Sequence, residues 1–187
     1  MLYIVGIVSG VTVLDNIMYV VCDGSSTICL YNTDACSPLD VVINVNGMKR
    51  PCDMVVCRDD RQLYVADKVM GIWRVSVADQ SYVLWLSTEL STDIFTRITG
   101  ITVSVTSRRL LMTSVLEPPH LRQYSTTDRP PLLRVVKLPR YMWEVLHSVE
   151  TTRGTFVVGH KGTSQDKWQH AVSELFSFGF FVALKLQ

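Results

Sequence analysis

The amino-acid sequence predicts an all-β protein, a β-propeller-like array of about four four-stranded antiparallel blades. Three observations support this prediction. The chain repeats itself at intervals of about 45 residues, short alternating segments are separated by polar turns, and a helical pattern is conceivable only around Gln165–Phe176. A propeller blade repeats at roughly 40–50 residues, and each blade needs a neighbour to cover its apolar faces.

The repeat is clearest in four apolar segments that each hold a large residue at the same place. These residues are separated by 45, 47 and 45 positions, and they are Tyr19, Tyr64, Leu111 and Phe156. A short alternating segment precedes each of them, and a segment with an aromatic residue and an outer strand follow. We therefore expect large side chains of the repeat to pack between blades, namely Tyr19, Tyr64, Leu111, Phe156, Trp73, Trp85 and Tyr124.

The spacing divides residues 1–187 into one propeller-like domain with blades at approximately 8–46, 50–91, 97–139 and 144–187. In the last blade, Phe178–Leu186 is a candidate for the outer strand. The turns between the first two strands of each blade are short and charged, as in Arg58-Asp59-Asp60-Arg61.

One stretch carries a family resemblance. RPCDMVVCRDDRQLYVADKVMGIWRVSV (Arg50–Val77) contains a proline, an apolar run, a turn, the motif LYVAD and a strand with an aromatic residue. It resembles an NHL repeat, and the pattern extends over roughly residues 10–160. NHL repeats are similar to the blades of lactonase-like and strictosidine-synthase-like six-bladed propellers. WD40 blades are not expected, because no Gly-His to Trp-Asp signature is present.

The resemblance implies a ring of six blades, whereas four repeats nearly fill the 187 residues. We therefore expect an incomplete ring, with Met1–Ile7 resembling an outer strand whose blade is missing. Open blade faces rich in Val, Ile and aromatic residues would favour self-association. The alternative is a compact arc whose open face is covered by Phe176–Leu184.

Composition limits the function. With 18 basic and 17 acidic residues the formal net charge is +1, which argues against a generic nucleic-acid binder. Five cysteines without a CxxC pair fit neither a closed disulfide set nor an ordinary zinc site, and reduced thiols indicate a cytoplasmic protein. The apolar C-terminal run is about ten residues long, too short to span a bilayer, so no membrane partner is expected.

Candidate binding residues lie in loops that a propeller gathers on one face. They are Arg50, Asp67, Lys68, Arg97, Arg140, His160, Lys161 and Trp168. The turns of the opposite face form an Arg-rich alternative surface for an acidic partner or RNA, with Arg58, Arg61, Arg108, Arg109 and Arg153.

No catalytic constellation is evident. A serine-hydrolase elbow and paired histidine motifs are both missing from the sequence. The lactonase resemblance implies a cation on the ring axis, but Asp53 is the one carboxylate at the predicted start of an inner strand. We therefore expect no metal or cofactor and a non-enzymatic module that binds a protein or peptide. The alternatives are a degenerate lactonase-like or strictosidine-synthase-like hydrolase and RNA binding through the Arg-rich surface.

Overall fold

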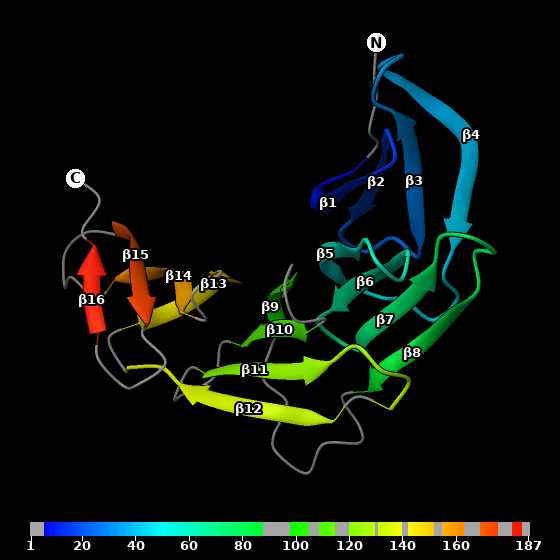
Figure 1. The fold of residues 1–187 in the computed structure, drawn as a ribbon. Helices are drawn as coiled ribbons and strands as arrows, with labels where there is room; N and C mark the ends of the chain where they lie inside the picture. The colour runs from blue at the N-terminus through cyan, green and yellow to red at the C-terminus, as the bar shows by residue number, and fades with distance from the viewer. Residues whose placement is uncertain are drawn as a thin grey trace. The chain divides into compact units, whose positions relative to one another are not determined.

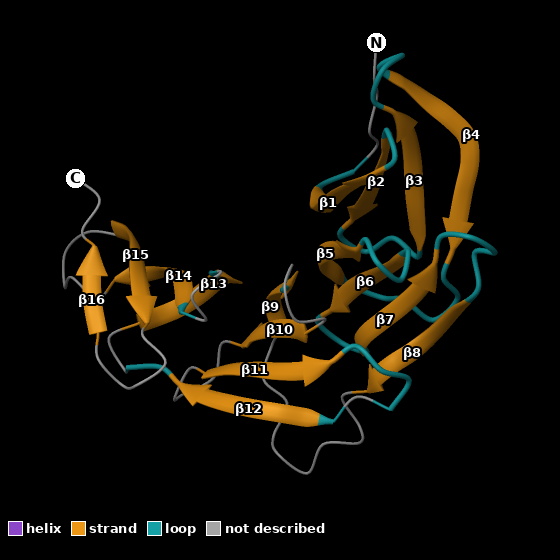
Figure 2. Cartoon of the chain, in the orientation of Figure 1, coloured by secondary structure: helices purple, strands orange, loops and turns teal. Residues whose placement is uncertain are grey.

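The computed structural model of the chain describes residues 6–87, 98–104, 109–114, 120–129, 131–139, 142–151, 155–162, 169–175 and 181–184. Within these residues the secondary structure is entirely β-strand and turn (Figure 2). The strands form four separate four-stranded antiparallel sheets, each made of four consecutive strands (Figure 1). The predicted all-β array of four-stranded blades is confirmed.

The strands follow the predicted repeat closely. The first sheet holds β1 (Val8–Leu14), β2 (Ile17–Cys22), β3 (Thr27–Asn32) and β4 (Ser37–Asn44). The second holds β5 (Pro51–Cys57), β6 (Gln62–Asp67), β7 (Gly71–Ser76) and β8 (Tyr82–Ser87). The third holds β9 (Ile98–Val103), β10 (Arg109–Ser114), β11 (His120–Ser125) and β12 (Leu132–Lys137). The fourth holds β13 (Met142–Glu150), β14 (Phe156–Gly162), β15 (Gln169–Leu175) and β16 (Phe181–Leu184).

The chain forms two compact units, residues 1–95 and 96–187, and each contains two sheets. The proposed grouping of all four blades into one domain stays a prediction. In the described residues every sheet is a meander, so no terminal strand completes a distant sheet. In the segment Met1–Ile7, residues 1–5 lie outside the described residues. The Ile7 carbonyl accepts a hydrogen bond from the Asp23 amide at 2.9 Å.

In the first unit, the two blades share one apolar core, and their inner strands β1 and β5 lie side by side. Tyr19 contributes from β2, Met54 from β5 and Trp73 from β7, and each is at most 6% exposed. Trp73 also meets Tyr82 edge to face, with ring centroids 6.2 Å apart. The expected burial of Trp73 between blades is therefore confirmed, as is the burial of Tyr19, Tyr64, Phe156, Trp85 and Tyr124.

Gly10 sets how closely the inner strands of this unit approach. A Cβ atom at Gly10 would lie 2.7 Å from the Met54 amide nitrogen and 2.8 Å from the Asp53 carbonyl carbon. Real Cβ atoms do not approach backbone atoms so closely, so only glycine permits this contact. The position is buried in the middle of β1.

The second unit repeats the arrangement with β9 beside β13. The Thr99 hydroxyl donates to the Val145 carbonyl at 2.7 Å and ties the two inner strands together. Leu121 and Phe156 belong to its apolar cluster, and the Arg134 guanidinium lies 5.7 Å from the centre of the Phe156 ring. Cation–π contact thus adds to the apolar packing of this blade pair.

Gln165–Phe176 was the one segment where a helix was conceivable. Its described part, Gln169–Leu175, is instead strand β15. The strand pairs with β14 on one side and β16 on the other, so two ladders satisfy its backbone groups and override the ambiguous side-chain spacing. The outer strand expected in Phe178–Leu186 is present as β16. No helix of the described residues is long and apolar enough to cross a membrane.

Replacing Trp73 with alanine is expected to lower the free energy of unfolding by about 3–5 kcal/mol, because it removes a large ring from a shared core. Trp73→Phe keeps an aromatic ring and should lose less. The exposed control Val83→Ala, on the neighbouring strand, should stay within about 0.5 kcal/mol of the parent. Urea denaturation followed by circular dichroism measures all three, and equal losses for Trp73→Ala and Val83→Ala would contradict the packing.

Gly10→Ala should destabilise the first unit by about 1–3 kcal/mol, because the added methyl group overlaps backbone of β5. Gly159→Ala is the matched control, since a Cβ atom there would sit 3.7 Å from the nearest atom, an ordinary contact. Thermal unfolding of both variants checks the prediction. A Gly10→Ala protein as stable as Gly159→Ala would show that β1 and β5 do not approach this closely.

Candidate interaction surface

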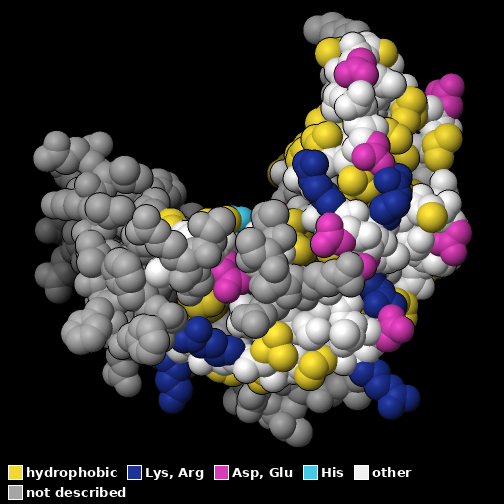
Figure 3. Space-filling view, viewed as in Figure 1, with side chains coloured by type: hydrophobic (Ala, Val, Ile, Leu, Met, Phe, Trp, Pro, Cys, Tyr) yellow, Lys and Arg dark blue, Asp and Glu magenta, His cyan; other side chains and the backbone are white. Residues whose placement is uncertain are grey.

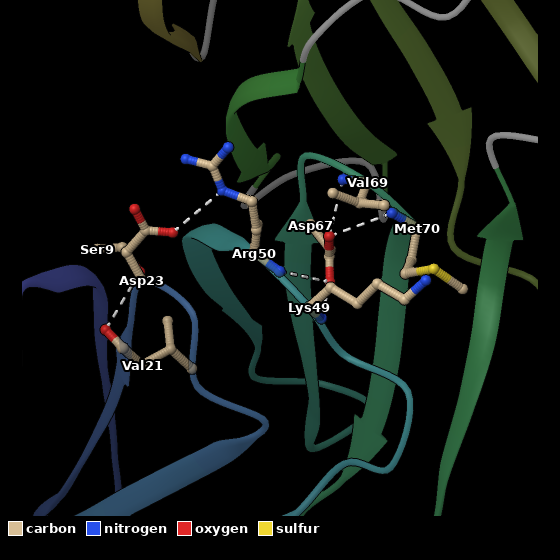
Figure 4. A network of polar contacts seen from close by, with 8 residues as sticks. All are labelled: Ser9, Val21, Asp23, Lys49, Arg50, Asp67, Val69 and Met70. Atoms are coloured by element: carbon tan, nitrogen blue, oxygen red, sulfur yellow. Dashed lines mark hydrogen bonds and ion pairs between the residues drawn. The ribbon is translucent and has the colours of Figure 1, made fainter.

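Two loops of the first unit converge on the side chain of Asp67, the last residue of β6 (Figure 4). One carboxylate oxygen accepts hydrogen bonds from the amides of Lys49 and Arg50, at 2.6 and 3.2 Å, in the loop between β4 and β5. The other oxygen accepts from the amides of Val69 and Met70, at 2.8 and 3.1 Å, in the turn between β6 and β7. A single carboxylate therefore fixes both loops.

Asp67 has no exposed surface. A buried carboxylate is costly unless hydrogen bonds replace its water, and the four amide donors meet that need. The local sequence explains the geometry, because an aspartate beginning a turn readily accepts bonds from amides two and three residues onward. Asp67 was expected among surface residues, but its side chain lies beneath them and supports their backbone.

Arg50 is held by its backbone and exposed at its side chain. Its amide binds Asp67, and its carbonyl accepts a hydrogen bond from the Lys68 amide at 3.0 Å. The guanidinium lies 3.6 Å from a carboxylate oxygen of Asp23, which follows β2 in the neighbouring blade. Both side chains are well exposed, 51% for Arg50 and 36% for Asp23, so the pair contributes at most about 1 kcal/mol to stability.

Asp23 was not among the predicted site residues, although the repeat offered a signal for it. Asp23 ends IMYVVCD as Asp67 ends QLYVAD, although Asp23 lies four residues after Tyr19 and Asp67 lies three residues after Tyr64. The two carboxylates have different environments. Asp67 is buried under its own loops, whereas Asp23 faces solvent and meets Arg50.

The loop surface of the first unit consists of exposed or half-buried side chains around this network, namely Asp23, Lys49, Arg50, Lys68 and Val69. Val69 is an apolar member, 42% exposed. Acidic, basic and hydrophobic side chains also lie intermixed across the part of the molecule formed by β1–β8 (Figure 3). Such a mixed surface offers ion pairs and apolar contact together.

The thiol of Cys52 lies beside this surface. Its pKa is raised to about 12, mainly by burial; Lys68 opposes the rise, and the nearby carboxylates of Asp53, Asp67 and Asp23 add to it. The thiolate is the nucleophilic form of cysteine, so Cys52 is unsuited to nucleophilic catalysis near neutral pH. None of the five cysteines forms a disulfide bond.

The opposite ends of the same strands carry the charged turns. Arg61 forms an ion pair with Asp15 of the neighbouring blade, and both side chains are more than half exposed. Asp15 and Asn16 have positive φ angles of 49° and 59°, as a two-residue hairpin turn requires. Arg58 is exposed in the next turn. Arg109 is the first residue of β10, and Arg108 and Arg153 lie outside the described residues.

The predicted binding residues of the second unit are not brought into a described surface. His160 lies in β14 and is 3% exposed, so its side chain packs inside. Lys161 follows it in the same strand. Arg97, Arg140 and Trp168 lie outside the described residues. The candidate surface is therefore confined to the first unit, where Arg50 and Lys68 occur together.

In the described part of the chain, no three His, Cys, Asp or Glu residues are placed so that together they could hold a metal ion. Asp53, the one carboxylate expected near the start of an inner strand, accepts a hydrogen bond from the Met54 amide at 2.8 Å. This contact fits a local structural role for Asp53.

Comparison with known proteins gives a fold and no family. No protein-family model matches the chain, and no curated protein sequence matches it. Several solved structures do align with the chain. U3-55K and the WD40 repeats of RRP9 each align with a TM-score of 0.71 at 11% identity, covering 97% of this chain and 52% of theirs. A structure of the mitotic checkpoint complex aligns with a TM-score of 0.61 at 13% identity, covering 81% and 45%.

These neighbours are WD40 β-propellers, which shows that the chain is built from β-propeller blades. The absence of a Gly-His to Trp-Asp signature argued against WD40-like blades, and that expectation is not supported. At 11–13% identity the likeness concerns the course of the backbone and says nothing about family motifs. The chain spans about half the length of the structures it matches.

Asp67→Asn should destabilise the first unit by about 2–4 kcal/mol, because an amide nitrogen would face backbone donors that the carboxylate now satisfies. Asp23→Asn is the control at the exposed aspartate that follows β2, and its exposed ion pair should contribute less than about 1 kcal/mol. Equilibrium urea unfolding compares the two. Similar small losses would mean that Asp67 does not hold the loops.

Cys52 should resist alkylation by iodoacetamide at pH 8. A pKa of about 12, against an ordinary 9.0, leaves roughly a thousandfold less thiolate than a free cysteine has at that pH. The exposed Cys36 should react much faster. Cys36→Ser should therefore remove a rapid phase of labelling that Cys52→Ser leaves intact, as mass spectrometry over time would show. Loss of the rapid phase in Cys52→Ser would contradict the burial of this thiol.

Proposed function

We propose that the chain is a non-enzymatic propeller module that binds a protein or peptide partner through the loop surface of its first unit. One observation carries the proposal. The buried Asp67 carboxylate fixes the backbone of both loops, while Arg50, Lys68 and Val69 remain at least partly exposed on them. Rigid loops that present charged and apolar side chains lose little conformational entropy on binding.

The chemistry of the surface indicates the kind of partner. Arg50 and the two lysines offer cations, so acidic side chains of the partner can bind there, and guanidinium groups form two-point contacts with carboxylates. Asp23 already lies near Arg50 at 3.6 Å, a loose contact that a partner carboxylate could replace. Fold likeness to propellers of the WD40 class and to a structure of the mitotic checkpoint complex supports a protein partner.

An NHL-type origin of the blades is a finer proposal, and it rests on the sequence of Arg50–Val77. LYVAD in that stretch is part of the strand that ends in Asp67, so the motif includes the residue that organises the loops.

The hydrolase alternative draws less support, because Cys52 is held as a thiol and the Asp53 carboxylate accepts a hydrogen bond from the Met54 amide. RNA binding draws less support as well, since Arg61 is paired with Asp15. A cytoplasmic location stays a proposal.

Self-association is a second candidate with an observation behind it. Val8, Val11 and Val13 of β1 are 41–47% exposed, an unusual number of apolar side chains for one inner strand. A second copy could cover them. Sedimentation of the parent protein and of Val11→Thr/Val13→Thr tests this: self-association that the two changes do not weaken would rule out this strand.

A photo-crosslinking experiment tests the partner surface. A photoreactive phenylalanine analogue placed at Val69 should capture a partner from the source cells. Reversing charge with Arg50→Glu/Lys68→Glu should reduce that captured product at least about tenfold, since close charge pairs at interfaces contribute 1.5 kcal/mol or more.

The control variant is Arg58→Glu, which reverses an exposed charge at the opposite ends of the strands. It should leave the product unchanged, and ribonuclease treatment should not remove it. Equal loss in both variants, or a product that disappears with ribonuclease, would contradict the proposal.

A further inference from the structure

The outer strand of the third blade, β12, is an edge strand in the described part of the chain. It is the terminal strand of its sheet and pairs there with β11 alone. An edge strand presents unpaired backbone donors and acceptors that another extended chain can bind. Five of its six residues are exposed, including Leu132, Leu133 and Val135 at 47–48%.

The two faces of β12 differ. Arg134 lies over the Phe156 ring and Val136 packs against the apolar cluster of the second unit, so this face is used by the next blade. Because side chains alternate along a strand, Val135 and Lys137 point to the other face. A partner strand beside β12 would therefore meet an apolar side chain and then a cation, two residues apart.

Charge distinguishes β12 from the other outer strands whose side chains are described. β12 carries Arg134 and Lys137 and no acidic residue. β4 has similarly exposed valines but carries Asp40, and β8 carries no charged residue. Charge complementarity therefore selects a partner segment with an acidic residue for β12 alone among these three edges.

Only a short stretch of β12 can pair with a partner strand. Pro131 directly precedes the strand and Pro139 follows soon after it, and proline cannot donate a backbone hydrogen bond to a ladder. A register shift opposite Gln123 and Tyr124 leaves Leu133 as an extra residue, so the regular run is Arg134–Lys137. A partner of four to six residues fits this edge, and an extended polymer of strands does not.

We infer that β12 binds a short acidic peptide segment, which adds to the sheet as a further antiparallel strand. Its apolar residue lies opposite Val135 and its carboxylate opposite Lys137. The site belongs to the second unit and does not depend on the loop surface proposed above.

The register defines a probe. In antiparallel order, the end-blocked peptide Glu-Thr-Val-Thr-Val-Thr places Glu opposite Lys137 and the first Val opposite Val135. Fluorescence anisotropy of the labelled peptide with the full chain should show saturable binding. Lys137→Glu should weaken it about three- to tenfold, from loss of an opposite-charge pair and gain of a like-charge pair.

Two controls distinguish strand addition at β12 from nonspecific binding of the peptide. Val135→Lys should also weaken binding several-fold, whereas Val42→Lys, at an equally exposed valine of β4, should not. A peptide N-methylated at alternate residues on its binding edge should lose measurable affinity, because the ladder needs its amides.

Several results would overturn the inference. They are equal binding of a peptide with Lys in place of Glu, equal binding of the N-methylated and unmodified peptides, or equal effects of Val135→Lys and Val42→Lys. Pairing of two copies through β12 would also overturn it. In that case sedimentation would show a dimer that Val135→Lys dissociates and that excess peptide does not compete away.

Discussion

A carboxylate can be buried only where hydrogen bonds replace its water, and at Asp67 the donors are four backbone amides of two different loops. This single interaction fixes the loop segment before β5 and the turn after β6 as one platform. Arg50 and Lys68 take their positions from backbone atoms bound to Asp67 or to each other, and the charged side chains then extend from a set backbone. The proposed binding surface therefore depends on a residue that a partner does not touch.

The platform in turn depends on how the blades pack. A four-stranded sheet cannot cover its own apolar faces, so the first unit pairs two blades around Tyr19, Met54 and Trp73. Gly10 lets the inner strands meet backbone to backbone. Ion pairs at both ends, Arg50 with Asp23 and Arg61 with Asp15, mark the same blade boundary but are too exposed to hold it.

The repeat made most of the fold predictable, because alternation and the large anchor residues report directly on strands and blade contacts. The third strand of the last blade escaped prediction, since its hydrogen-bonding neighbours, not its spacing, decide its conformation. The binding surface was harder to predict from the sequence. Arg50 and Lys68 were found from loop position, but the similar segments IMYVVCD and QLYVAD do not indicate that Asp67 is buried and Asp23 is exposed. The burial of His160 could likewise not be predicted from the sequence, because it depends on how neighbouring segments pack.

Amide hydrogen exchange shows whether the loop surface is fixed before any partner arrives. The amides of Lys49, Arg50, Val69 and Met70 are expected to exchange slowly although they lie in loops. Asp67→Asn should make them exchange rapidly while the amides of β6 stay protected. Exchange rates expected for an unstructured peptide of the same sequence provide the fast reference. Loop amides that exchange in the native protein at those rates would show that the loops are not fixed.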